Sequence, residues 1–231
     1  MDRRIKFLLI IIFVAVTTVF TYHFFRGLFA LPPSSMEKSL TVGNYKFVSK
    51  VNNIPSLPKE VITKYDSIFA NHKEYISDGF DYPVGPPDAK GYYDAQPFTK
   101  NSHLGEDWNG VGGGNSDLGD PVYAAANGYV ALVHDYMGGW GNVIRIIHKL
   151  PDGRYIETLY AHEKDVYIKE GEFVKRGKKI GIMGNLGGAM YAHVHFEMRH
   201  TIDMDLGGGY SSDTTGFMNP KAFIKKNRPK R

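Results

Sequence analysis

The chain contains no cysteine among its 231 residues, and this absence excludes disulfide bridges and thiolate-ligated metal sites. Positive charge is also not spread evenly along the chain, although the net charge is +4. Residues 1–6 and 225–231 carry net charges of +2 and +5, which leaves about −3 for the residues between them. The body of the chain therefore has no obvious face for nucleic acid. We interpret the basic tail, residues 225–231, as a solvated chain end.

A long apolar run stands at the start of the chain. It covers residues 7–25 and follows a short cytoplasmic start, residues 1–6, which contains Arg3, Arg4 and Lys6. A helix of this length just spans about 30 Å of hydrocarbon, and the basic cluster should stay in the cytoplasm. We therefore expect a single-pass transmembrane signal anchor in the cytoplasmic (inner) membrane, with the rest of the chain periplasmic or otherwise extracytoplasmic.

A cleaved signal peptide is the alternative interpretation of the same segment. Its charged start and its apolar core of about 14 residues fit that description. The cleavage site is poor, because Leu28-Phe29-Ala30 has a large residue where a small one is usual. We favour a retained anchor, and in either case the remainder of the chain is exported.

The remainder divides into a linker and a β-rich domain. Residues 26–79 are the predicted linker, in which residues 58–77 are expected to form one helix because apolar side chains recur on one stripe. Residues 80–224 hold short strand-like segments between glycine-rich turns, such as "NVIRIIHK" and "YIETLYAH" joined by "LPDGR", which is typical of a hairpin. Within them His148 lies mid-strand and is expected to be half-buried. The sequence predicts a mainly β, antiparallel two-layer domain with one accessory helix.

The stretch "YAHVHFEMRH", residues 191–200, places two histidines one residue apart on a predicted strand. Because side chains alternate with a period of two, His193 and His195 share one face, with Cβ atoms about 6.5–7 Å apart. Val194 and Phe196 then point into a core. Spacing alone allows both histidines to be metal ligands, and it also allows an unconnected pair on a solvated face.

The stretch "NSHLGEDW" adds a histidine and a carboxylate, His103 and Asp107. On a straight strand they would lie about 13 Å apart, too far for one metal ion, whose ligand atoms lie about 3–3.5 Å apart. Gly105 and the glycine-rich run that follows argue against a helix, so we expect a turn at Leu104–Gly105 to bring the two side chains together. Two histidine nitrogens and a carboxylate are a common catalytic zinc set. His162, at the end of the strand "LYAH", is the natural fifth member of the group.

The segments "HLGED", "YAH" and "HVHFE", in that order, resemble the lysostaphin-type (LytM-like) zinc peptidoglycan metalloendopeptidases. The stretches "LGDPVYAAANGYV", "GNVIRIIH" and "GEFVKRGKKIGIMGN" are similar to that family as well, so the resemblance covers roughly residues 82–200. It implies a duplicated-hybrid-motif-like β domain. It also implies an endopeptidase that hydrolyses peptide bonds in bacterial peptidoglycan through a water activated by Zn²⁺.

The resemblance also implies a role for each residue of the group. His103, Asp107 and His195 match the family's zinc ligands, and His162 and His193 match the two histidines beside the metal-bound water. Zinc held by two neutral imidazoles and a carboxylate lowers the pKa of its water from 15.7 toward about 7. We expect His193 to be the general base and the proton donor to the leaving amine, and His162 to hydrogen-bond the water or the oxyanion, in roles that they could exchange.

Three features depart from the family's pattern. Ala192 stands where the family usually has proline before the first histidine of H-x-H, and the loop "WNGVGGGNSD" is longer than expected. The stretch "NLGGAMY" stands where Ser/Thr-Gly steps are frequent. These positions border the expected groove, so they bear on the choice of substrate more than on the chemistry.

Two other functions fit parts of the sequence. A catalytically silent LytM-like regulator that activates a cell-wall amidase would share the fold, but it would be expected to lose metal ligands that this chain retains. A carrier domain is suggested by "KEGEFVKRGKKIGIMG", which resembles the hammerhead turn of biotinyl and lipoyl carriers and of sugar phosphotransferase IIA domains. The predicted export of the chain and the lack of a Met-Lys-Met-like sequence at the tip of this turn argue against a carrier. The expected partners are a peptidoglycan peptide and, through the N-terminal helix, the membrane.

Overall fold

The structure, a computed structural model, describes residues 59–229. The expected membrane segment, residues 7–25, and the cytoplasmic start, residues 1–6, lie outside the described residues. Within residues 59–229, no helix is both long enough and apolar enough to cross a membrane. All of the described residues belong to one compact unit.

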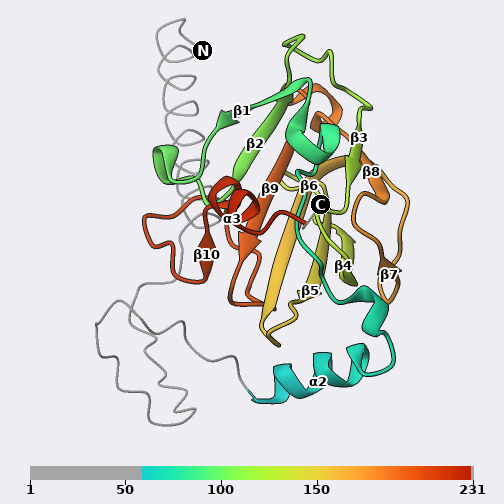
Figure 1. The fold of residues 1–231 in the computed structure, drawn as a ribbon. Helices are drawn as coiled ribbons and strands as arrows, with labels where there is room; N and C mark the ends of the chain where they lie inside the picture. The colour runs from blue at the N-terminus through green and yellow to red at the C-terminus, as the bar shows by residue number, and fades with distance from the viewer. Residues whose placement is uncertain (1–58, 230–231) are drawn as a thin grey trace, which may run out of the picture. The chain divides into compact units, whose positions relative to one another are not determined.

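Ten antiparallel strands make up most of the regular structure in residues 59–229 (Figure 1). In chain order they are β1 Tyr92–Gln96, β2 Glu106–Gly110, β3 Pro121–Tyr123, β4 Gly128–Asp135, β5 Asn142–Lys149, β6 Tyr155–Val166, β7 Phe173–Val174, β8 Lys179–Met183, β9 Val194–Arg199 and β10 Phe217–Met218. Hydrogen bonds join them in the order β1-β2-β9-β6-β5-β4-β7, while β10 pairs with β9, and β8 pairs with β3 and β6. The prediction of a mainly β, antiparallel domain is confirmed.

Strand β5 lies between β4 and β6, and both of its faces are covered. Ile144 and Ile146 point into the main core, whereas Val143 and Ile147 belong to two smaller apolar clusters. A strand buried on both faces reads as a nearly continuous apolar run. His148 shares this environment and is fully buried, so the expectation of half burial was wrong.

The main core gathers side chains from almost every strand and from the C-terminal helix α3, Pro220–Lys226. Pro220 occupies the first turn of α3, where a missing N–H costs nothing. The side chain of Asn219 caps the helix by accepting the N–H of Ala222. Ile224 is thereby held fully buried against the core.

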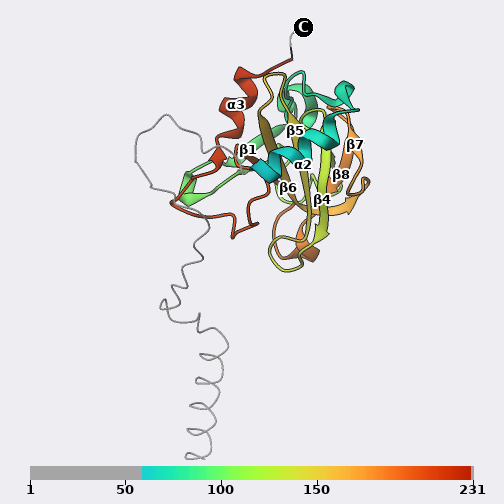
Figure 2. The same ribbon diagram turned by 90° about the horizontal axis from the view of Figure 1, so that it is seen from below.

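Helix α2, Lys59–Phe69, lies across strands β4 to β6 (Figure 2). Its buried residues, Tyr65 and Phe69, pack with Tyr155 in a second apolar cluster. The helix is shorter than the predicted 58–77, because the chain turns after Phe69 and continues as a single 3₁₀ turn, Lys73–Tyr75.

Candidate metal centre

Three hydrogen-bond acceptors converge on one point beside the sheet. The Nε2 atom of His103 lies 2.9 Å from Nδ1 of His195 and 3.3 Å from Oδ1 of Asp107. The Nδ1 atom of His195 lies 3.0 Å from the same carboxylate oxygen. The side chains of His103 and His195 are almost fully buried, and that of Asp107 is 13% exposed, so the carboxylate is the most accessible part of the group.

Strand pairing and one sharp bend bring the three side chains together. Asp107 of β2 stands directly opposite His195 of β9 in the ladder. The chain bends at Leu104–Gly105, as predicted, and this bend returns His103 to the same place. Gly105 is required there, because a Cβ atom at this position would lie 2.7 Å from the carbonyl oxygen of Phe196.

The tautomers of the two imidazoles follow from their other hydrogen bonds. His103 donates Nδ1–H to the backbone carbonyl of Gln96 at 3.0 Å, since a carbonyl can only accept. His195 donates Nε2–H to the carboxylate of Glu197 at 3.0 Å. In its neutral form each ring therefore turns a lone pair toward Asp107, and this partner arrangement is typical of metal-ligating histidines.

Three acceptors without a shared proton repel one another unless a cation lies between them. Two neutral nitrogens and a carboxylate oxygen at tetrahedral Zn²⁺ would stand about 3.3 Å apart, given bond lengths of about 2.0–2.2 Å. The three separations in the structure, 2.9, 3.0 and 3.3 Å, are close to that spacing. His103, Asp107 and His195 thus fit a zinc ion by donor type, charge and spacing.

The surroundings favour positive charge at this point. Burial by itself would lower the pKa of His195, but hydrogen bonds to Asp107 and Glu197 outweigh burial and raise this pKa to about 9. Burial opposes ionisation of Asp107 too, yet its interactions with His103 and His195 hold its pKa well below the usual range. A proton and a metal ion compete for the same lone pair, so metal binding here should release protons.

His162 and His193 lie beside the three acceptors and are not part of that group. The Nδ1 atom of His162 lies 3.2 Å from the carbonyl of Trp140, and that of His193 lies 2.8 Å from the carbonyl of Tyr191. Both rings therefore donate Nδ1–H to the backbone and keep a lone pair on Nε2. The two ring centroids are 4.8 Å apart, and Nε2 of His193 is 3.8 Å from Oδ1 of Asp107.

His162 sits where β6 exchanges one neighbouring strand for another. The strand pairs with β9 as far as Ala161 and with β8 from Glu163 onward. At this fork His162 has φ +69°, a left-handed conformation that is uncommon outside glycine. Burial, together with the neighbouring His193 and His195, lowers the pKa of His162 to about 3, so its ring is neutral at physiological pH.

A cavity of about 400 Å³ opens over the site. Its lining contains four of the five predicted residues, with His103 buried beneath them. Trp140 stacks near His162 and meets His195 edge-on, and its indole N–H donates to the carbonyl of Gly207. Tyr210 lies across the buried ring of His103, at a centroid distance of 5.1 Å. The cavity thus has two aromatic side chains beside the histidines.

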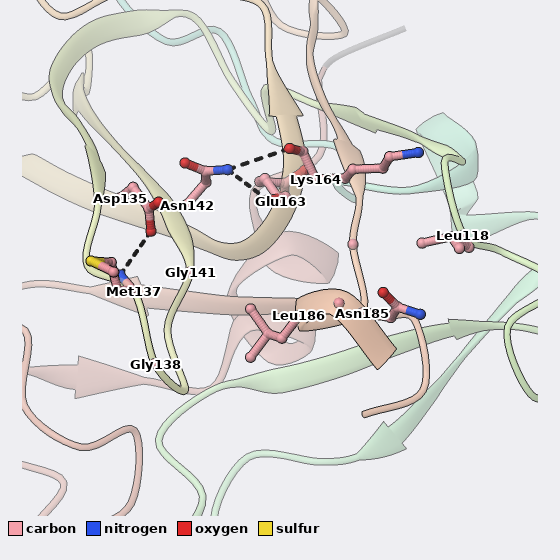
Figure 3. Close-up of a pocket in the computed structure, with 12 residues that line it drawn as sticks. Leu118, Asp135, Met137, Gly138, Gly141, Asn142, Glu163, Lys164, Asn185 and Leu186 are labelled. Carbon is pink, nitrogen blue, oxygen red and sulfur yellow. Dashed lines mark hydrogen bonds between the residues drawn. The ribbon is translucent and has the colours of Figure 1, made fainter. Parts of the chain in front are cut away.

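A second cavity, of about 480 Å³, shares no lining residue with the first. It lies between the loop that carries Met137, Gly138 and Gly141 and the segment that carries Asn185 and Leu186 (Figure 3). The first loop also supplies Gly139 and Trp140 to the first cavity. Neighbouring residues of this loop therefore line both cavities.

The structure therefore brings together all five residues that the sequence singled out. Sequence reasoning missed Trp140, Tyr210 and Glu197. A signal for Glu197 was present, because it lies two residues after His195 on one strand and so shares its face. Tyr160, two residues before His162 on β6, is fully buried in the core.

Comparison with known proteins agrees with this geometry. Residues 103–207 match the family described as Peptidase family M23, and this range contains all five site residues. A lipoprotein NlpD of Yersinia enterocolitica is 38% identical over 82 residues, which are 36% of this chain and 79% of that protein. The chain belongs to peptidase family M23. The resemblance to LytM-like proteins is confirmed.

Other M23 relatives carry names of two kinds. The peptidoglycan DD-endopeptidase ShyA of Vibrio cholerae is 35% identical over 83 residues, which are 35% of this chain and 18% of ShyA. The murein hydrolase activator NlpD of Salmonella dublin is 33% identical over 94 residues, which are 38% of this chain and 24% of that protein. The chain thus spans most of the first relative but a quarter or less of these two.

Proposed function

We propose that this M23 chain is a zinc endopeptidase that hydrolyses peptide bonds in bacterial peptidoglycan. The observation that carries the proposal is the convergence of the acceptor atoms of His103, Asp107 and His195 within 3.3 Å of one another. Two further histidines stand beside this group with free Nε2 lone pairs. A site with metal ligands alone would bind an ion, whereas ligands together with adjacent bases can also move protons.

Zinc held by the three ligands would supply a Lewis acid and lower the pKa of water toward about 7. His193 would accept a proton from that water at Nε2 and later donate it to the leaving amine. His162 would orient the same water by accepting its second hydrogen at Nε2. The carbonyls of Tyr191 and Trp140 hold both rings in the tautomer that these steps need.

The cavities and the relatives support the substrate class. The cavity over the histidines gives a peptide room beside the proposed ligands, and the loop that carries Trp140 also lines a second cavity. The name of ShyA states a peptidoglycan DD-endopeptidase, and we carry that substrate class to this chain as part of the proposal.

We further propose that the domain is tethered to the cytoplasmic membrane and works outside the cytoplasm. Residues 7–25 support this through their length, their apolar character and the basic residues before them. An anchored hydrolase would act only on the wall layer within reach of its linker.

A regulator that activates a wall amidase is the second candidate, because one relative is named a murein hydrolase activator. The presence of all three ligands and both flanking histidines favours the enzyme. A regulator has no use for a free base beside a metal ion, so the two candidates differ in the consequence of removing His193.

The deciding experiment compares the full chain with His193→Ala on purified peptidoglycan, with released fragments identified by mass. Removal of a general base typically lowers a rate by about 10²–10⁴-fold, and zinc content should not change. His134→Ala is the matched control, because His134 is exposed and outside the site. If the parent chain binds zinc, releases no fragments and stimulates an amidase equally with either substitution, the regulator replaces the enzyme.

A further inference from the structure

The segment that leads into His193 is held by side chains where the strand ladder stops. Strands β2 and β9 pair as far as Trp108 and Val194. Beyond that point the amide of Asn109 donates to the carbonyl of Ala192 at 2.9 Å. The side-chain oxygen of Asn115 accepts the N–H of the same residue, also at 2.9 Å. Two asparagines therefore replace the missing ladder bonds on both sides of Ala192, each holding one of two successive peptide units.

Asn115 is exposed, but the N–H that it receives is not. Ala192 is fully buried, and a buried backbone N–H without an acceptor costs about as much as a lost hydrogen bond. Proline at this position would have no N–H to satisfy. Ala192 therefore has a buried N–H that needs an acceptor, and Asn115 supplies it.

The glycine-rich loop is anchored so that it delivers Asn115 to this point. The buried carboxylate of Asp117 accepts the N–H of Gly110 at 2.7 Å and closes the loop. At the far end, Gly119 donates to the carbonyl of Met183 at 2.9 Å. The longer loop and the alanine before His193 look like separate departures from the family's pattern. The hydrogen bond between Asn115 and Ala192 connects them.

We propose that Asn109 and Asn115 are positioning residues for His193, a role that rests on the function proposed above. The ring of His193 takes its orientation from the carbonyl of Tyr191, which belongs to the peptide unit whose N–H Asn115 receives. Asn109 holds the carbonyl of the next unit, Ala192–His193. Loss of either contact frees one of the two peptide units that lead into His193, and Nε2 of its ring moves with the backbone. Neither asparagine touches the three metal ligands in any contact found among residues 59–229, so zinc binding is not part of the role.

The two asparagines differ in their hydrogen-bonding role, because one donates and the other accepts, and this difference gives a sharp test. Asn115 acts as an acceptor, so Asn115→Asp keeps the contact and Asn115→Ala removes it. Asn109 acts as a donor, so Asn109→Asp places a carboxylate against a carbonyl oxygen and removes its contact. Ser116→Ala, an exposed neighbour in the same loop, is the control. The same Asn→Asp change should thus be tolerated at one position and harmful at the other.

The test uses the full chain, zinc-loaded, in detergent, with ¹⁵N-labelled histidine. The first readout is the rate at which the Nδ1–H of His193 exchanges with water, measured by NMR. The second is kcat and KM on a peptidoglycan-derived peptide, with zinc content and melting temperature measured alongside. For Asn115→Ala and Asn109→Asp we expect exchange at least about tenfold faster and kcat about 10- to 100-fold lower, with KM and zinc within about twofold. Asn115→Asp and Ser116→Ala should stay within about threefold of the parent.

Unchanged exchange and unchanged kcat in both harmful variants would overturn the positioning role. So would a loss of rate that tracks a loss of zinc or of thermal stability, because the asparagines would then support the fold in general. The proposed function can fail separately. If the parent hydrolyses nothing while the exchange rate still responds, the positioning role stands and the enzyme assignment falls.

Discussion

The Nε2–H of His195 donates to one carboxylate oxygen of Glu197, and Arg199 binds the other oxygen of that carboxylate through two nitrogens, at 2.8 and 2.5 Å. Arg199 also contacts Glu157, which in turn forms a bidentate pair with Arg145. All five side chains are buried. His195 therefore stands at one end of a row of buried side chains with alternating charge, which crosses strands β9, β6 and β5.

Glu197→Gln should weaken both metal binding and the fold. The amide oxygen can still accept from His195, but the amide NH₂ then faces the buried Arg199 in place of the oxygen that Arg199 binds through two nitrogens. We expect zinc affinity to fall about 10- to 100-fold and the free energy of unfolding to fall by about 3 kcal/mol. Competition with a chelator and urea unfolding measure the two effects. Glu172→Gln, at an exposed glutamate, should change neither, and equal behaviour of the two variants would refute the link.

The stability of the domain should depend on pH through His148. Burial lowers the pKa of this ring to about 4, whereas the unfolded chain has about 6.5. Between these values the unfolded state binds a proton that the native state does not, so the free energy of unfolding falls as the pH drops from about 6.5 to 4. The loss attributable to His148 is about 3 kcal/mol, and it is absent above pH 6.5.

His148→Gln isolates this contribution, because parent and variant share every other titrating group. The variant should be less stable than the parent at pH 7, since it loses the contacts of the ring with Asn127 and Thr158. Its disadvantage should shrink as the pH approaches 4. Urea unfolding at pH 7, 6 and 5 gives the comparison, and parallel stability curves would show that the buried ring does not titrate as expected.

Phe69→Ala should destabilise the domain without affecting its metal. The ring of Phe69 is 2% exposed and packs edge-on against Phe173, at a centroid distance of 5.4 Å. Its removal should lower the free energy of unfolding by about 3 kcal/mol, and zinc content of the folded protein should stay at the parental value. Ser67→Ala, on the exposed side of α2, is the control. Loss of zinc in folded Phe69→Ala would instead couple α2 to the site.

Local pattern predicted strands β5 and β9, the shared face of His193 and His195, and the bend before Asp107. The stretch "NVIRIIHK" coincides with β5, and β9 covers residues 194–199 of the stretch "YAHVHFEMRH". The strand period placed His193 and His195 on one face, and both indeed face Asp107. The bend at Leu104–Gly105 was predicted because the ligand atoms of one metal ion must lie about 3–3.5 Å apart.

The parts that the sequence did not predict depend on contacts between distant segments. Trp140 and Tyr210 lie on loops, and nothing in their own neighbourhood indicates which cavity they line. His148 is fully buried because β5 lies inside the sheet, between β4 and β6, and this position depends on the strand order. Asn115 has no local signal at all, since its role appears only when a loop from β2 reaches the residue before His193.

The metal content of the purified full chain tests the central claim most directly. Elemental analysis should find one zinc per chain in the parent and in the His162→Ala and His193→Ala variants. It should find less than a tenth of that in His103→Ala, Asp107→Ala and His195→Ala. A parent chain without zinc, or an Asp107→Ala variant that keeps its full zinc, would contradict the claim that these three side chains hold one ion.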